Sequence, residues 1–229
     1  MLEIFTTSEY DNKIIIVDGD NKYTYADIKQ QIAWQIENLK DKKDNIVILS
    51  GSNYGFIIHY FAALFCKKNV YLLADRTRLN DIKFDFDILE GKEFGKIKEY
   101  SFPELNPKKA TFKFFTSGST GTPKTIEKSL YNLIVEGEDV LNEFNLMNKN
   151  YNVITTTTMC HSFCLSCLIM FFLFPDFVIH TKDISYPDNI DVENSILITT
   201  PSFLSTIPKY DIKFGITPKY IFSAGSKID

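Results

Sequence analysis

Nine consecutive residues, Thr116-Ser117-Gly118-Ser119-Thr120-Gly121-Thr122-Pro123-Lys124, combine hydroxyl, glycine and lysine side chains directly after an apolar run. Glycines let a backbone curl until successive N–H groups converge on an anion. Serine and threonine hydroxyls add hydrogen bonds to phosphate oxygens, and the lysine brings a mobile positive charge. A polar surface turn has a similar composition, but the density of the run and its ending in Pro-Lys favour a polyphosphate-binding loop.

This loop differs from the phosphate loop of nucleoside triphosphatases. Gly118 and Lys124-Thr125 have the separation of that motif, but Pro123 stands where the motif requires glycine. A proline at this position removes a phosphate-facing N–H. The sequence therefore argues against a triphosphatase of that class.

Three cysteines, Cys160, Cys164 and Cys167, have the C-x₃-C-x₂-C spacing of radical-SAM iron–sulfur enzymes. A cluster needs thiolates on an exposed loop, whereas these residues recur at helical spacing on one face, among Phe, Leu, Ile and Met. Small core thiols explain the pattern better, and a continuous helix also makes a tetrahedral zinc site with His161 awkward. The iron–sulfur enzyme is kept as a remote alternative.

The elements around these residues predict an α/β fold. A hairpin over residues 13–23 precedes a helix that Thr24 caps, with Asp27 as its capping-box partner. Ile46–Leu49, a helix over 54–66 and Val70–Leu73 form a βαβ unit with parallel strands.

Further along, the strand Thr111–Phe115 leads into the loop, and Ser129 caps a helix whose expected core face includes Val140, Leu141 and Phe144. A helix over 161–173 follows. Further strands are expected at these segments: 86–89, 153–157, 177–179, 196–199 and 220–223. The irregular stretch 75–109 is the expected internal seam.

Composition narrows the class of protein. The chain has 229 residues, 45% of them hydrophobic, and a formal net charge of −4, which argues against nucleic-acid binding. Its longest apolar run, Phe163–Phe174, is shorter than the roughly 20 residues of a membrane helix, so no membrane insertion is expected. No secretory signal is visible, and the four cysteines lie in apolar surroundings, which is typical of reduced thiols. Both features predict a cytoplasmic protein. Because the chain stops at Asp229, just after a predicted strand, we expect it to be a fragment.

The loop Thr116–Lys124 resembles the signature loop of the adenylate-forming superfamily, which comprises acyl-CoA synthetases, peptide-synthetase adenylation domains and luciferases. Other segments are similar to further motifs of that superfamily in the same order: Tyr23–Asp27, Tyr71–Asp75, Cys160–Cys164, Thr200–Ser202 and Ser223–Lys227. Ser162 and Cys164 replace the glycines that commonly flank Phe163 in the His-x-Phe motif.

The resemblance implies a site for ATP. The β- and γ-phosphates of ATP would bind the signature loop, with Mg²⁺ held through the phosphates near Thr120. The residues that it assigns to phosphate are Thr116, Ser117, Gly118, Ser119, Thr120, Gly121, Thr122 and Lys124. Ala224, Gly225 and Ser226 would pack against adenine, and His161 and Phe163 would line the acyl pocket. A lone histidine beside an apolar helix is otherwise more often a cap or a core residue.

The implied reaction is the ATP-dependent activation of a small carboxylic acid (acyl, aryl or amino acid) as an acyl-adenylate, followed by transfer to a thiol of CoA or of an acyl or peptidyl carrier protein. Residues 1–229 would be the amino-terminal portion of an AMP-binding domain, with mixed sheets flanked by helices. The carboxy-terminal part and its small mobile domain would be absent, so this portion alone is expected to be inactive.

Two further inferences concern the kind of protein and its substrate. A non-catalytic nucleotide-binding relative of these ligases is the alternative. No acidic residue occurs between Met159 and Phe174, which favours a substrate other than an amino acid.

Overall fold

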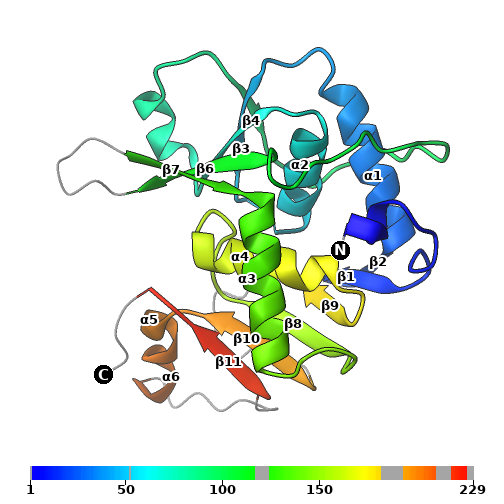
Figure 1. Ribbon diagram of the computed structural model, residues 1–229. Helices are drawn as coiled ribbons and strands as arrows, with labels where there is room; N and C mark the ends of the chain where they lie inside the picture. Colours follow the sequence, from blue (N-terminus) through cyan, green and yellow to red (C-terminus); the bar gives the residue numbers. More distant parts are fainter. Residues whose placement is uncertain (1, 52, 117–123, 182–192, 210–217, 226–229) are drawn as a thin grey trace.

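The computed structural model describes residues 2–51, 53–116, 124–181, 193–209 and 218–225 and arranges their strands in two sheets (Figure 1). The five-stranded sheet has the order β5-β3-β4-β6-β7, and the six-stranded sheet has the order β11-β10-β8-β9-β1-β2. All neighbouring strands are parallel except β6 with β7 and β1 with β2, which form hairpins. The α/β prediction is confirmed.

The five-stranded sheet is built from β3 (Asn45–Leu49), β4 (Asn69–Leu73), β5 (Asp87–Leu89), β6 (Thr111–Thr116) and β7 (Lys124–Ser129). The parallel β3–β4 pair confirms the predicted βαβ unit. The stretch 75–109 connects β4 to β6, two strands that pair directly, and it contains the 3₁₀ helix η2 (Arg76–Asp81).

The six-stranded sheet combines the second half of the chain with the amino-terminal hairpin. Its strands are β1 (Ile14–Asp18), β2 (Asn21–Thr24), β8 (Tyr151–Thr155), β9 (Phe177–His180), β10 (Ser195–Thr199) and β11 (Tyr220–Ser223). The hairpin joins this sheet because β1 pairs in parallel with β9, with Ile16 opposite Ile179.

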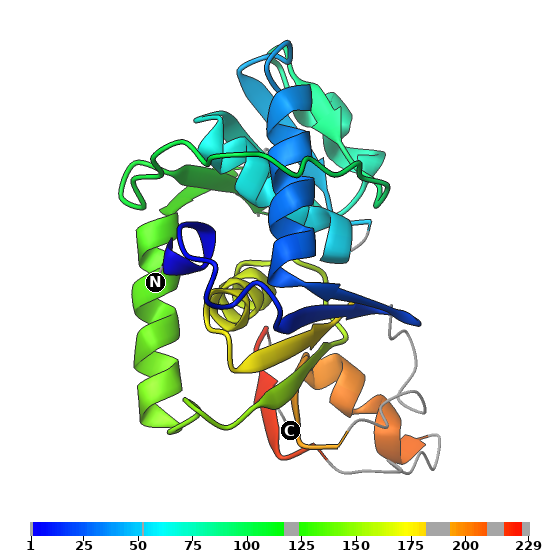
Figure 2. The same cartoon turned by 90° about the vertical axis from the view of Figure 1, so that its right-hand side faces the viewer.

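The helices are α1 (Tyr25–Asn38), α2 (Asn53–Phe65), α3 (Leu130–Glu143), α4 (Ser162–Leu173), α5 (Pro201–Leu204) and α6 (Thr206–Lys209), and the 3₁₀ helix η1 covers Leu2–Phe5. Helices α2 and α4 lie between the two sheets, and α1 and α3 run alongside them (Figures 1 and 2). The larger of two hydrophobic clusters among the described residues contains residues from both sheets. Its centre is the contact between α2 and α4, where the rings of Phe61 and Phe172 lie 5.0 Å apart.

Local signals begin the helices as predicted. Thr24 caps α1 in a capping box with Asp27, and Ser129 caps α3 in the same way with Asn132. The apolar α4 is a buried core helix, and no helix among the described residues is long and apolar enough to span a membrane.

Two local predictions were wrong. Phe144 is 46% exposed rather than part of the core face of α3, because it is the C-cap residue, and its ring contacts Phe222 at 5.4 Å instead. Cys160 precedes α4, since His161 is the N-cap, so the three cysteines do not share one continuous helix.

Candidate functional site

The predicted adenine segment follows β11 and the predicted acyl segment follows β8, two strands of the six-stranded sheet that β10 separates. β8, β10 and β11 are parallel, and their register places Ile198 opposite Thr155 and Thr199 opposite Ser223. Their carboxyl ends therefore meet at one edge, which is where open α/β sheets bind ligands. Ala224 and Gly225 leave this edge after β11, whereas Ser226 lies outside the described residues.

Threonines fix the backbone at this edge. The hydroxyls of Thr156 and Thr199 lie 2.7 Å apart in a hydrogen bond that ties the end of β8 to the end of β10. Thr200 accepts a hydrogen bond from the N–H of Phe203 and so caps α5, with Pro201 as its first residue. The predicted turn at residues 200–202 thus follows β10, the strand that pairs with β11.

Gly225 leaves space for a flat ligand. Its φ of +118° is a conformation that L-residues with a side chain rarely adopt, and no atom lies within 4 Å of the Cβ that it lacks. An approaching ring can contact the backbone at this position. The open backbone at Gly225 leaves room for a flat ring such as adenine, and the assignment of Ala224, Gly225 and Ser226 to adenine stays a prediction.

His161 and Phe163 stand at the start of α4. His161 is exposed, and its backbone carbonyl accepts the N–H of Leu165, while its side chain makes no capping hydrogen bond. Phe163 is half-buried and lines a groove of about 460 Å³ between α3 and α4. The groove is also lined by Lys128, Glu136, Gly137, Asp139, Val140, Ser162, Ser166, Cys167 and Met170.

Sequence reasoning missed the contribution of α3 to this groove. Glu136 and Asp139 come from α3, and Ser166 of α4 donates a hydrogen bond of 3.1 Å to Glu136. Gly137 in the middle of α3 was the available signal, because an interior helical glycine often marks close packing.

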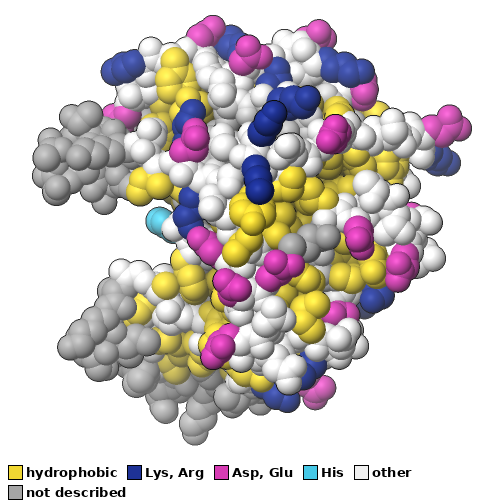
Figure 3. Space-filling model, in the orientation of Figure 1, with side chains coloured by type: hydrophobic (Ala, Val, Ile, Leu, Met, Phe, Trp, Pro, Cys, Tyr) yellow, Lys and Arg dark blue, Asp and Glu magenta, His cyan; other side chains and the backbone are white. Residues whose placement is uncertain are grey.

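The predicted phosphate loop closes the β6–β7 hairpin. The strands pair from Thr111 opposite Ser129 to Thr116 opposite Lys124, so the loop begins and ends at one pair of opposite residues. Its residues 117–123 lie outside the described residues, as does the magnesium prediction for Thr120. The hairpin and the end of β11 point toward the same side of Figure 1, where the molecule is hollowed between the two sheets (Figure 3).

A polar cavity of about 610 Å³ lies between the carboxyl ends of both sheets. Its walls include Asp18, Ser50, Lys92, Thr181 and the four threonines 155–158. Lys92 forms an ion pair of 3.3 Å with Asp18, which also accepts a hydrogen bond from Thr181. The run of threonines at the carboxyl end of the strand predicted over 153–157 was the sequence signal for this cavity.

The cysteines are core residues. Cys164 donates a hydrogen bond to the carbonyl of Thr157, and burial raises the pKa of its thiol to about 12. Burial also raises the pKa of Cys167 to about 12. Protonated thiols are poor metal ligands, and the described residues contain no group of three side chains that could hold a metal ion.

Comparisons with known proteins identify the fold. No family model and no curated protein sequence matches the chain. Solved structures do match: a variant of E. coli MenE with bound OSB-AMS has a TM-score of 0.75 and 12% identity over 95% of this chain and 52% of its own. The o-succinylbenzoate CoA synthetase MenE from Bacillus subtilis, in complex with the acyl-adenylate intermediate OSB-AMP, has a TM-score of 0.73 and 13% identity over 98% of this chain and 53% of its own.

The N-terminal subdomain of Klebsiella oxytoca NpsA, in complex with 3-hydroxyanthranilyl-AMSN, matches with a TM-score of 0.75 and 13% identity over 98% of this chain and 65% of its own. The two sheets are therefore the fold of the amino-terminal domain of adenylate-forming enzymes, as the signature loop predicted. The chain spans about half the length of the two MenE enzymes.

Proposed function

We propose that this chain provides the ATP-binding part of an AMP-forming acid–thiol ligase, which activates a small carboxylic acid as an acyl-adenylate and passes it to a thiol of CoA or of a carrier protein. The observation that carries the proposal is the placement of two predicted ATP segments on this fold. The signature loop joins β6 to β7, and Ala224-Gly225 follows β11 at a ligand-binding edge of parallel strands.

The proposed reaction is a displacement at phosphorus. A carboxylate oxygen attacks the α-phosphorus of ATP, the bond from that phosphorus to the bridging oxygen breaks, and pyrophosphate leaves. Such a step depends on alignment and on neutralising the phosphate oxygens. Lys124 and the hydroxyls of Ser117, Ser119 and Thr120 would hold the leaving pyrophosphate. Mg²⁺ suits these hydroxyl and phosphate oxygens and would supply further charge neutralisation when bound.

His161 has a distinct proposed role at the start of α4. It is exposed. The next two residues along the chain, Ser162 and Phe163, line the α3–α4 groove, so His161 stands at the end of that groove. We assign it to the mouth of the acyl pocket, where an imidazole can contact the carboxylate that approaches ATP. Phe163 would then line the pocket interior.

Nucleotide binding is expected of this chain alone, and turnover is not. The neighbours are about twice as long, so half of their residues have no counterpart in the chain. A relative that binds nucleotide without catalysis is the second candidate. ATP–pyrophosphate exchange with a panel of acids, in the chain supplemented with the remainder of such an enzyme, separates the two: acid-dependent exchange supports the ligase.

Lys124→Ala tests the phosphate site directly. Loss of one charge-assisted contact to phosphate costs about 1.5–3 kcal/mol, so the affinity of the chain for ATP, measured by calorimetry, should fall about tenfold or more. The control is Lys109→Ala, which removes an equal charge just before β6 begins. Equal ATP affinity in both variants would contradict the assignment of the loop.

A further inference from the structure

The α3–α4 groove has an apolar floor that depends on a glycine. A Cβ at Gly137 would lie 2.7 Å from Cγ of Met170, so only glycine lets α3 and the side chain of Met170 approach this closely. Met170 is buried, and Phe163 and Cys167 continue the same surface along α4. This floor suits the hydrocarbon body of a ligand.

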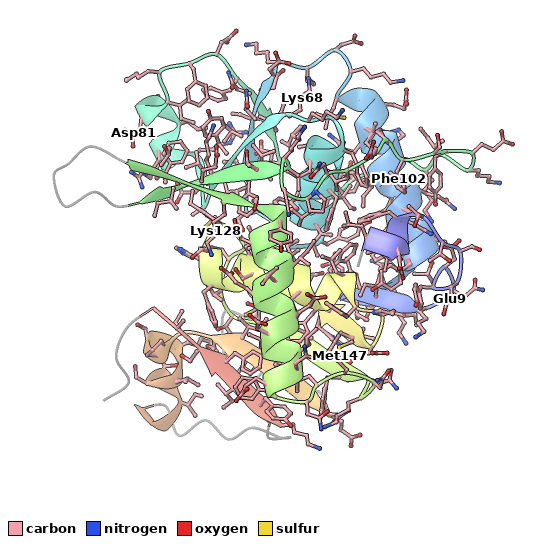
Figure 4. The ribbon with its side chains drawn as sticks, in the orientation of Figure 1. Glu9, Lys68, Asp81, Phe102, Lys128 and Met147 are labelled. Atoms are coloured by element: carbon pink, nitrogen blue, oxygen red, sulfur yellow. The ribbon has the colours of Figure 1, made fainter. Side chains whose placement is uncertain are left out.

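The wall formed by α3 carries two carboxylates with different surroundings. Glu136 is neutralised by Lys128, whose Nζ lies 3.0 Å from Oε1 and 3.3 Å from Oε2, and it accepts the hydroxyl of Ser166. Figure 4 labels Lys128 at the amino-terminal end of α3. Asp139, one turn farther along α3, is exposed and has no ion-pair or hydrogen-bond partner within the part of the chain that the structure describes.

The charges of the groove therefore do not balance. Lys128 offsets Glu136, and the carboxylate of Asp139 leaves one negative charge beside an apolar floor. A ligand that fills the groove gains by placing a positive group near Asp139, and a ligand that places a second carboxylate there is repelled. Charge complementarity of this kind selects among ligands of equal size.

We infer that the groove holds the body of the acid substrate and that Asp139 selects acids whose far end is a protonated amine, so that the enzyme activates an amino acid in the broad sense. The inference rests on the proposed function, which supplies the carboxylate end near His161. It reverses the expectation drawn from α4 alone: no acidic residue lies on that helix, but α3 brings two to the same groove.

Three acids with the same five-methylene chain test the inference: 6-aminohexanoate, heptanoate and heptanedioate. Met170 is one of only four methionines, so the NMR signal of its ¹³C-labelled methyl group, assigned with Met170→Leu, reports occupation of the groove. Met147, labelled in Figure 4 beyond the carboxyl end of α3, reports binding elsewhere. Each acid is titrated into the chain without nucleotide.

We expect 6-aminohexanoate to shift the Met170 signal with an affinity about fivefold above that of heptanoate, the range of one partly exposed charge pair, and heptanedioate to bind more weakly than either. In Asp139→Asn the affinity for 6-aminohexanoate should fall to that for heptanoate, and the affinity for heptanoate should not change. Asp41→Asn removes an equal exposed charge just after α1 and should change nothing.

Equal affinities for the three acids, a shift of Met147 in place of Met170, no binding of any acid, or an amine preference that persists in Asp139→Asn would each overturn the inference. These outcomes are separate from the proposed function, because ATP affinity and its dependence on Lys124 are measured without any acid. A chain that binds ATP but shows one of these contrary results in the acid titration would have the nucleotide site and would activate a different kind of acid.

Discussion

The backbone N–H of Met159 donates a hydrogen bond of 3.1 Å to the hydroxyl of Ser50, and this bond joins the two sheets. Ser50 follows β3 of the five-stranded sheet, while Met159 lies between β8 of the six-stranded sheet and α4. Met159 is fully buried, so its N–H loses its acceptor when the Ser50 hydroxyl is removed. The bond holds the segment before His161 against the other half of the molecule.

Ser50→Ala should therefore lower the free energy of unfolding by about 1–3 kcal/mol, the cost of leaving a buried N–H without a partner. Urea denaturation measures this change. Ser101→Ala is the matched control, because Ser101 is exposed in an irregular segment, and surface substitutions of this kind stay within about 0.5 kcal/mol. Equal midpoints for the two variants would show that the two sheets do not depend on this bond.

Gly55→Ala should destabilise the chain although alanine is the better helix former. Replacing a helical glycine by alanine ordinarily gains about 1 kcal/mol, but a Cβ at Gly55 would lie 1.9 Å from the carbonyl oxygen of Gly91. Overpacking against backbone costs about 1–3 kcal/mol or more, so we expect a net loss of about 2 kcal/mol in urea denaturation.

Gly51→Ala is the control for Gly55→Ala. Gly51 lies two residues before α2, and nothing lies within 4 Å of the Cβ that it lacks. We expect no loss of stability in this variant. A stabilised Gly55→Ala would mean that the segment around Gly91 moves away from α2 at little cost.

Local sequence patterns predicted most of the elements because short-range physics determines them. The strand Tyr220–Ser223 has the predicted ends, and Thr24 and Ser129 cap their helices through side chains three residues away. The loop Thr116–Lys124 predicted the fold through its resemblance to the signature loop of the adenylate-forming superfamily.

Long-range pairing was not predictable from the same patterns. The parallel pairing of β1 with β9 joins residues about 160 positions apart, and the burial of β1 does not specify which strand lies beside it. The groove carboxylates were missed for a similar reason. The contact between Gly137 and Met170 determines which face of α3 meets α4. The spacing of apolar residues within α4 does not reveal this contact.

His59 makes the stability of the fold depend on pH. It is 5% exposed on α2, with its ring 5.0 Å from Phe94, and burial lowers its pKa to about 4, while the nearby carbonyls of Glu90 and Gly91 oppose that shift only in part. An unfolded histidine has a pKa near 6.5. Between these two values the unfolded chain binds a proton that the folded chain does not, so stability falls as the pH decreases from about 6.5 to about 4.

The lowered pKa of His59 corresponds to a loss of about 3 kcal/mol in the free energy of unfolding as the pH falls through that range. His59→Gln, which cannot take up the proton, should therefore lose less stability than the parent chain between pH 6.5 and pH 4, whatever its stability at pH 7. Urea denaturation at several pH values measures the difference.

His180 contributes in the same direction, because burial lowers its pKa as well, so some acid sensitivity should remain in the variant. His161→Gln removes an exposed histidine and should keep the steep pH dependence of the parent. Parallel stability curves for His59→Gln and the parent would show that this ring takes up its proton without leaving the core.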